Sequence, residues 1–311
     1  MSTNPRRSLL PYLVLLTGVV VASSAAIMVR LLQAEPIGMP SVAIAAGRLG
    51  LAALILLPIG LVRARHEVWA LPWGDRIRGI VSGMFLAVHF ASWIASLEYT
   101  SVASSVALVS TNPLWVALAS AIWLRERPGM PTLVGIALTI GGSLLIAISD
   151  SDGSSGAQAN IGNMLALVGA VTVSGYFLIG RELQRRVSTL TYIWIVYTSA
   201  ALTLLGAAWI SGATVQLVLP AGSSLPPLTP VLLVLALAVG PQLLGHTAFN
   251  WSLRHLSATF IAVALLGEPI GSALLALALF GEGFEELQLA GFVLLLIGIA
   301  VAAFTERGNQ H

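Results

Sequence analysis

Residues 110–127 read STNPLWVALASAIWLRER, and this stretch shows the pattern that decides the fold. Its apolar segment ends at Arg125 and Arg127 and is interrupted by the pair Asn112-Pro113. A helix that crosses a bilayer needs about 20 predominantly apolar residues, and proline breaks the backbone hydrogen bonding of a helix. The stretch therefore predicts a membrane span that has an internal break and ends at a positively charged membrane face.

Runs of the same kind fill the chain. Of its 311 residues 57% are apolar and 9% are charged, with a mean hydropathy of +0.91. A soluble domain has about 25% charged residues, so a soluble protein is excluded. The sequence predicts an all-α integral membrane protein with ten transmembrane helices. The expected spans are 9–32, 38–62, 79–98, 102–124, 130–149, 161–181, 190–211, 229–251, 257–280 and 287–304.

The basic residues orient these spans. If the N-terminus lies in the cytoplasm, thirteen of the 15 arginines fall on the cytoplasmic side and none in an outer loop, while Arg30 and Arg48 lie within helices. Arginine and lysine are concentrated in cytoplasmic loops of membrane proteins. We therefore expect a multi-pass protein of the cell inner (plasma) membrane with both termini in the cytoplasm. The net charge of +2 reflects the arginines on the cytoplasmic side of the membrane. We therefore expect no nucleic-acid partner.

An internal repeat divides the chain into two halves. Pro113, Glu126, Gly135 and Gly142 recur 156 positions later as Pro269, Glu282, Gly291 and Gly298. A second match, offset by 151 positions, pairs Gly18, Ser23, Arg30, Leu32 and Gln33 with Gly169, Ser174, Arg181, Leu183 and Gln184. Each half holds five spans, an odd number, so the second half enters the membrane from the opposite side. We expect inverted repeats at 1–152 and 153–311 and transport by alternating access, although a duplication can also enlarge a scaffold or house an enzyme.

The repeated segments resemble a known family. Residues 110–115 with 124–127, their partners 266–269 with 280–282, and Gly47-Arg48-Leu49 are similar to the EamA-type branch of the drug/metabolite transporter superfamily. The resemblance implies a ten-helix basket, a central cavity built by both halves, and export of small metabolites. By overall similarity, the chain looks most like the YddG-type exporters of aromatic amino acids.

Polar side chains at helical spacing indicate the cavity wall. On the third span Ser82, Phe85, His89, Trp93 and Ser96 share one face, and on the eighth Gln242, His246 and Asn250 do so. Corresponding helices of the two halves therefore carry matching polar stripes. Each histidine alone has the alternative of being a buried packing residue. Neither has a second metal ligand at helical spacing, and the chain has no cysteine, so we expect no metal and no other cofactor.

Two charges are predicted deep in the membrane, where each costs about 2.5–3.5 kcal/mol on insertion scales. We interpret Arg48 as a structural clamp to a neighbouring helix, with a site for a substrate carboxylate as the alternative. Glu268 could carry a coupling proton, bind a substrate ammonium or pair with Arg48. Pro113 and Pro269 each remove a backbone hydrogen bond in the middle of a span and are predicted hinges.

The aromatic residues on these helices complete the predicted site. Indole and phenol rings stack on aromatic ligands and attract ammonium groups, although each ring has packing as its alternative role. The predicted substrate-binding residues are His89, Trp93, Tyr99, Asn112, Trp115, Tyr176, Gln242, His246, Asn250, Trp251 and Glu268.

The expected function is export of amino acids, above all aromatic and other hydrophobic ones, by facilitated diffusion or proton exchange. The partners would be a small-molecule substrate and the lipid bilayer, and the fused halves predict a functional monomer. A transporter of nucleotides, sugars or another small metabolite is the alternative, but phosphates would need several basic groups in the cavity. A membrane-embedded enzyme would need clustered carboxylates or histidines at one face, and only Asp150 and Asp152 offer this, so we expect no enzyme.

Overall fold

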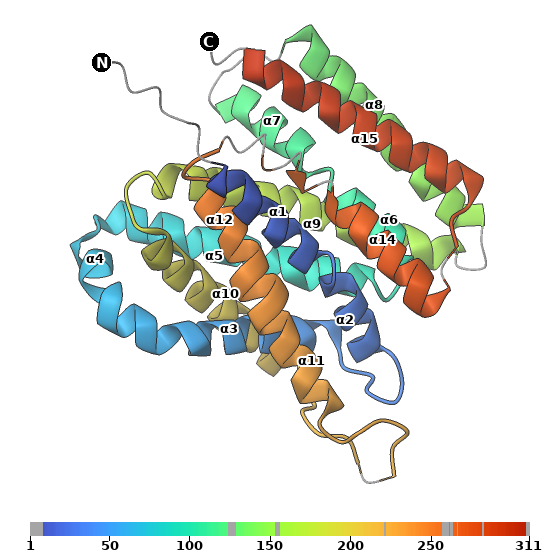
Figure 1. Cartoon of the computed structure of the whole chain (residues 1–311). Helices are drawn as coiled ribbons and strands as arrows, with labels where there is room; N and C mark the ends of the chain where they lie inside the picture. The colour runs from blue at the N-terminus through green and yellow to red at the C-terminus, as the bar shows by residue number, and fades with distance from the viewer. Residues whose placement is uncertain are drawn as a thin grey trace.

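Apolar runs fold into helices across the computed structural model of the chain (Figure 1). The structure describes residues 9–123, 129–152, 156–220, 222–256, 261, 264–265, 267–281 and 283–308, and these ranges contain no strand. The elements are α1 (Leu10–Ala22), α2 (Ala25–Gln33), α3 (Ser41–Arg63), α4 (Arg65–Ala70), α5 (Trp73–Ser96), α6 (Val102–Val109), α7 (Asn112–Trp123), α8 (Met130–Asp152), α9 (Gly156–Leu183), α10 (Thr189–Ser211), α11 (Thr229–Leu237), the π-helix η1 (Ala238–His246), α12 (Thr247–Ser252), α14 (Gly267–Phe280) and α15 (Glu286–Gly308).

Seven helical stretches of the described chain are long and apolar enough to cross a membrane. They are Leu10–Gln33, Ser41–Arg63, Trp73–Ser96, Val102–Ala119, Gln158–Leu183, Thr189–Ser211 and Thr229–Ser252, and each coincides with a predicted span. The other three predicted spans fall on α8, α14 and α15, whose apolar segments within the described residues are shorter. The expectation of a multi-pass helical membrane protein is thus confirmed, and the count of ten spans stays a prediction.

Several spans are interrupted where the sequence carries hydroxyl residues or proline. Ser110 and Thr111 separate α6 from α7, so the break predicted at Pro113 is present. The Thr111 hydroxyl donates to the carbonyl of Leu108 at 2.7 Å, a local bond that competes with helical hydrogen bonding. Pro269 lies in the first turn of α14, and residues 262–263 and 266 before it lie outside the described residues.

The span Thr229–Ser252 changes its helical form at mid-length. Its central part is the π-helix η1, which contains Pro241. Proline cannot donate a backbone hydrogen bond, and π-helical turns occur most often at functional sites. This segment carries Gln242 and His246, two residues of the predicted eighth-span stripe.

Glycines allow α8 and α15 to pack closely against each other as a pair at one side of the molecule (Figure 1). A Cβ atom added to Gly142 would lie 2.6 Å from the carbonyl oxygen of Gly291, and one added to Gly298 would lie 2.7 Å from that of Gly135. The sequence predicts that these glycines bring helices together. The structure confirms this and shows that their partner helix belongs to the same chain.

Replacing Gly142 by alanine should destabilise the protein by about 1–3 kcal/mol, because the new methyl group meets backbone atoms that can move only together with α15. Thermal unfolding in detergent measures the effect. Gly206→Ala on α10 is the control, since nothing lies within 4 Å of its added Cβ and alanine favours a helix. Equal melting temperatures for the two variants would contradict the close packing of α8 and α15.

Candidate functional site

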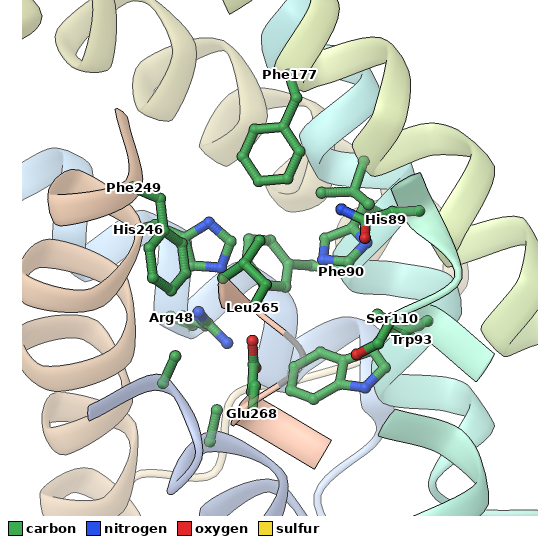
Figure 2. Close-up of a pocket in the computed structure, with 15 residues that line it drawn as sticks. Arg48, His89, Phe90, Trp93, Ser110, Phe177, His246, Phe249, Leu265 and Glu268 are labelled. Atoms are coloured by element: carbon green, nitrogen blue, oxygen red, sulfur yellow. The ribbon is translucent and has the colours of Figure 1, made fainter. Parts of the chain in front are cut away.

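A cavity lies between α1, α3, α5, α9, η1 and α14, near the breaks in the helices. It encloses about 500 Å³ including its open side, and Figure 2 shows side chains from several helices pointing into it. Of the predicted residues it brings together Arg48, His89, Trp93, Asn112, His246 and Glu268. Residues up to 220 positions apart in the sequence, Arg48 and Glu268, therefore share one site, which draws on both predicted halves.

Arg48 is the most buried charge of the site, with 1% of its surface exposed. Its Nε donates to Oε1 of Gln242 on η1 at 2.9 Å, and its Cζ lies 4.0 Å from the centroid of the Phe90 ring. These contacts fix the guanidinium by a hydrogen bond and a cation–π interaction. Its Nη1 has no hydrogen-bond partner among the described residues. Arg48 thus clamps α3 to η1 and keeps one donor group unused beside the cavity.

Glu268 brings the opposite charge to the same cavity from the first turn of α14. Its side chain is half-buried, and in Figure 2 the carboxylate points into the space between Arg48 and Trp93. A carboxylate is stabilised in the first turn of a helix by the helix dipole. The described residues contain no ion pair between Arg48 and Glu268, so the two charges face one space without neutralising each other directly.

Histidine and aromatic rings form the remaining wall. The His89 ring lies parallel to the Trp93 ring at a centroid distance of 6.3 Å, and its Nδ1 is 2.9 Å from the carbonyl oxygen of Gly169 on α9. His246 lies 5.2 Å from the Phe90 ring and 5.4 Å from the Phe249 ring. Flat faces and ring edges are thus both presented to the cavity.

Unused polar atoms surround the cavity. Within the described chain, Nε1 of Trp93, Oδ1 of Asn112 and Nδ1 of His246 lack hydrogen-bond partners, as does Nη1 of Arg48. A buried polar atom without a partner costs about 1–3 kcal/mol. A ligand with both hydrogen-bond donors and acceptors would satisfy these atoms.

The cavity is narrow in this conformation. Its free volume for water-sized molecules is only about 40 Å³, enough for a few of them. A metabolite of amino-acid size does not fit without displacement of the walls. Binding of an amino-acid-sized ligand here would therefore require the walls of the cavity to move apart.

Other predicted residues lie outside the cavity. Gln242 lies behind Arg48, and the Tyr176 hydroxyl donates to Oδ1 of Asn250 at 2.6 Å in a buried cluster between α9 and α12. The Trp251 ring contacts the His255 ring at a centroid distance of 4.1 Å, with the two planes tilted by 34°. The structure places Trp115 in a different pocket and Tyr99, half-buried, just after the end of α5.

Three phenylalanines line the cavity that sequence reasoning did not identify, namely Phe90, Phe177 and Phe249. Phe249 follows His246 by three residues, so helical spacing could have found it. Phe90 directly follows His89 and Phe177 directly follows Tyr176, so each lies on the helix face next to that of a predicted residue. In the described chain, no group of three His, Asp or Glu side chains could hold a metal ion.

Comparisons with known proteins agree with a membrane transporter. Residues 9–148 and 160–304 match the EamA-like transporter family. The pseudopaline exporter CntI of Pseudomonas aeruginosa is 25% identical over 75% of this chain and 75% of its own. The riboflavin transporter of Vibrio cholerae is 26% identical over 58% of this chain and 61% of its own. A protein crystal structure with 20% identity covers 97% of this chain and 99% of its own at a TM-score of 0.64, so the fold is shared.

Replacing Gln242 by leucine should destabilise the protein by about 1.5–3 kcal/mol, because Nε of the buried Arg48 loses its acceptor. Chemical or thermal unfolding in detergent measures this change. Gln158→Leu serves as the control, since Gln158 is exposed near the start of α9. A Gln242 variant as stable as this control would show that the hydrogen bond to Arg48 does not stabilise the fold.

Proposed function

The chain belongs to the EamA-like transporter family, and from this premise we propose that it exports amino acids, above all aromatic ones, across the cell inner membrane. Membership of this family indicates that the chain is a transporter of small metabolites. The named relatives handle pseudopaline and riboflavin, so they leave the substrate of this chain open. Support for a substrate class comes from the chemistry of the cavity.

The observation that carries the proposal is the pair of opposite charges in one cavity. Arg48 keeps Nη1 unused, and the Glu268 carboxylate points into the same space. An amino acid presents a carboxylate and an ammonium on neighbouring atoms. Its carboxylate would accept from Arg48 and its ammonium would donate to Glu268, so each buried charge would gain a partner.

The aromatic rings support a preference for aromatic side chains. Trp93 and His89 present parallel ring faces, and Phe90, Phe177 and Phe249 enclose the space beside them. A flat ring gains about 0.5–1.5 kcal/mol beyond its buried area by packing against other aromatic rings. A single arginine in the cavity would leave a phosphorylated substrate with too few basic partners, which argues against nucleotides.

Equivalent contacts in the two halves support inverted repeats at 1–152 and 153–311. Nε2 of Gln33 donates to the carbonyl of Ile94 at 2.8 Å, and Nε2 of Gln184 donates to that of Asn250 at 2.7 Å. The glutamines are 151 positions apart and the acceptors 156, which are the two offsets of the sequence repeat. The two family matches likewise divide the chain near residue 152.

Helix packing repeats in the same way. In the predicted repeat the first span corresponds to the sixth and the third to the eighth. Helix α5 of the third span packs on α9 of the sixth span. Helix α1 of the first span likewise packs on η1 and α12 of the eighth span. We propose that exchange of conformation between these halves opens the narrow cavity to each side in turn. The few charges in the cavity favour facilitated diffusion as the driving mode. Proton exchange through Glu268 is the alternative, and a flux that ignores an imposed pH gradient would exclude it.

Counterflow in proteoliposomes tests the substrate and the role of Trp93. Wild type should exchange tryptophan and phenylalanine saturably, and Trp93→Ala should lower their transport about two- to tenfold while alanine or serine transport changes less. Trp209→Ala is the matched control, because Trp209 is 85% exposed on α10. Saturable flux of riboflavin with none of any amino acid would refute amino acid export. Equal losses for aromatic and aliphatic substrates would refute stacking.

Glu268→Gln tests recognition of the ammonium group. Its loss of charge should weaken transport of tryptophan about tenfold or more, because a hydrogen bond between charged groups becomes one to a neutral amide. Transport of indole-3-propionate, which lacks the ammonium but keeps the ring and carboxylate, should be unchanged or improved. Parallel loss of both compounds would mean that Glu268 supports the structure of the cavity and does not bind the ammonium.

A further inference from the structure

A second pocket lies directly behind the broken segment between α6 and α7. We name it the lateral pocket; it lies between α6, α7, α8 and α9 and is lined by Leu108, Trp115, Ile140, Leu144, Asn163 and Leu167 among others. Ser110 and Asn112 face the central cavity, whereas Thr111 between them faces the lateral pocket. The two spaces are thus separated by a single segment of chain.

The lateral pocket is wide enough for a ligand in this conformation. Its open space is about 470 Å³, which lies within the range of about 300–1,000 Å³ that is usual for ligand sites. The same measure gives about 40 Å³ for the central cavity. The larger space is therefore the one outside the proposed transport site.

The walls of the lateral pocket open to the surface of the membrane-spanning helices. Ile140 is 46% exposed, Leu144 57% and Met164 62%, all on α8 and α9. Exposed apolar side chains of spanning helices contact lipid hydrocarbon. A ligand that enters between them comes from the bilayer.

The buried side chain of Asn163 in the wall of the lateral pocket indicates which part of a lipid would bind there. Asn163 is 4% exposed and accepts a hydrogen bond from the Thr100 hydroxyl at 3.0 Å, but its Nδ2 has no partner among the described residues. Asn163 lies five residues inside the apolar span Gln158–Leu183, about 8 Å from its end. The headgroup layer is about 5–8 Å thick on each side of the hydrocarbon core, so Asn163 lies near the depth of the ester groups.

The apolar walls continue from this depth towards the membrane centre. Along α9 the pocket is lined from Asn160 to Leu167, seven residues or about 10 Å of helix rise. One leaflet of a bilayer has about 15 Å of hydrocarbon. The pocket is thus long enough for a large part of one extended acyl chain.

We propose that the lateral pocket binds one acyl chain of a phospholipid, whose ester carbonyl accepts a hydrogen bond from Nδ2 of Asn163. The acyl chain of the lipid then packs against Thr111 and Trp115. It supports the α6–α7 break from the side opposite Ser110 and Asn112. Trp115, predicted above as a substrate-binding residue, contacts lipid in this arrangement. The inference depends only on the chain spanning a membrane and is independent of the amino acid substrate.

Native mass spectrometry in mild detergent tests the site, with palmitoyl-oleoyl phosphatidylethanolamine added to the purified protein. Wild type should retain one lipid per chain. Leu144→Trp fills the pocket from its exposed side and should abolish retention, and Asn163→Leu should weaken it about two- to tenfold through loss of one hydrogen bond. Ile148→Trp is the control, because Ile148 is 51% exposed one turn further along α8 and does not line the pocket.

Three results would overturn the proposal: a wild-type chain that retains no phospholipid, equal retention by Leu144→Trp and Ile148→Trp, or a bound mass that corresponds to detergent or to a second copy of the chain. Thermal unfolding without added lipid checks that each variant folds. If Leu144→Trp does not fold, Ile140→Trp, one turn deeper and 46% exposed, replaces it with the same expected loss.

Discussion

The rest of the site depends on the burial of one positive charge in the middle of a membrane protein. Arg48 on α3 is 1% exposed, so its guanidinium must find partners on neighbouring helices. Gln242 supplies an acceptor, the Phe90 ring supplies a negative face, and Glu268 supplies the opposite charge across the cavity. None of these uses Nη1, so the cavity contains a charge that is held in place and keeps one donor group without a partner among the described residues.

The helix breaks and the charges occur together for a physical reason. Regular transmembrane helices satisfy their own backbone and leave nothing polar for a ligand, whereas interrupted ones are tolerated where they line a cavity. The α6–α7 break brings Ser110 and Asn112 to the cavity, and the π-helix η1 brings Gln242 beneath Arg48. The breaks are also the points at which the helices can bend, so the segments that supply polar groups are the ones expected to move.

Much of the architecture could be predicted from the residues because a bilayer imposes strict lengths and charge distributions. The break at Pro113 and the convergence of Arg48, His89, His246 and Glu268 follow from proline chemistry and from the cost of polar groups in hydrocarbon. The stripe on the eighth span was a weaker guide. Asn250 lies four residues after His246, yet it accepts a hydrogen bond from Tyr176 and does not line the cavity. Phe177 could not be found, since an apolar residue on a spanning helix looks the same whether it faces lipid or a cavity.

The proposed transport site requires that Arg48 and Glu268 together hold a zwitterion in the cavity between the two halves. The most direct measurement is an experimental structure of the protein with saturating tryptophan in lipid nanodiscs. We expect a widened cavity with the ligand carboxylate within hydrogen-bond distance of Nη1 of Arg48, its ammonium beside the Glu268 carboxylate, and its indole against Trp93. Tryptophan bound elsewhere, or bound here with Arg48 and Glu268 contacting only each other, would contradict the account.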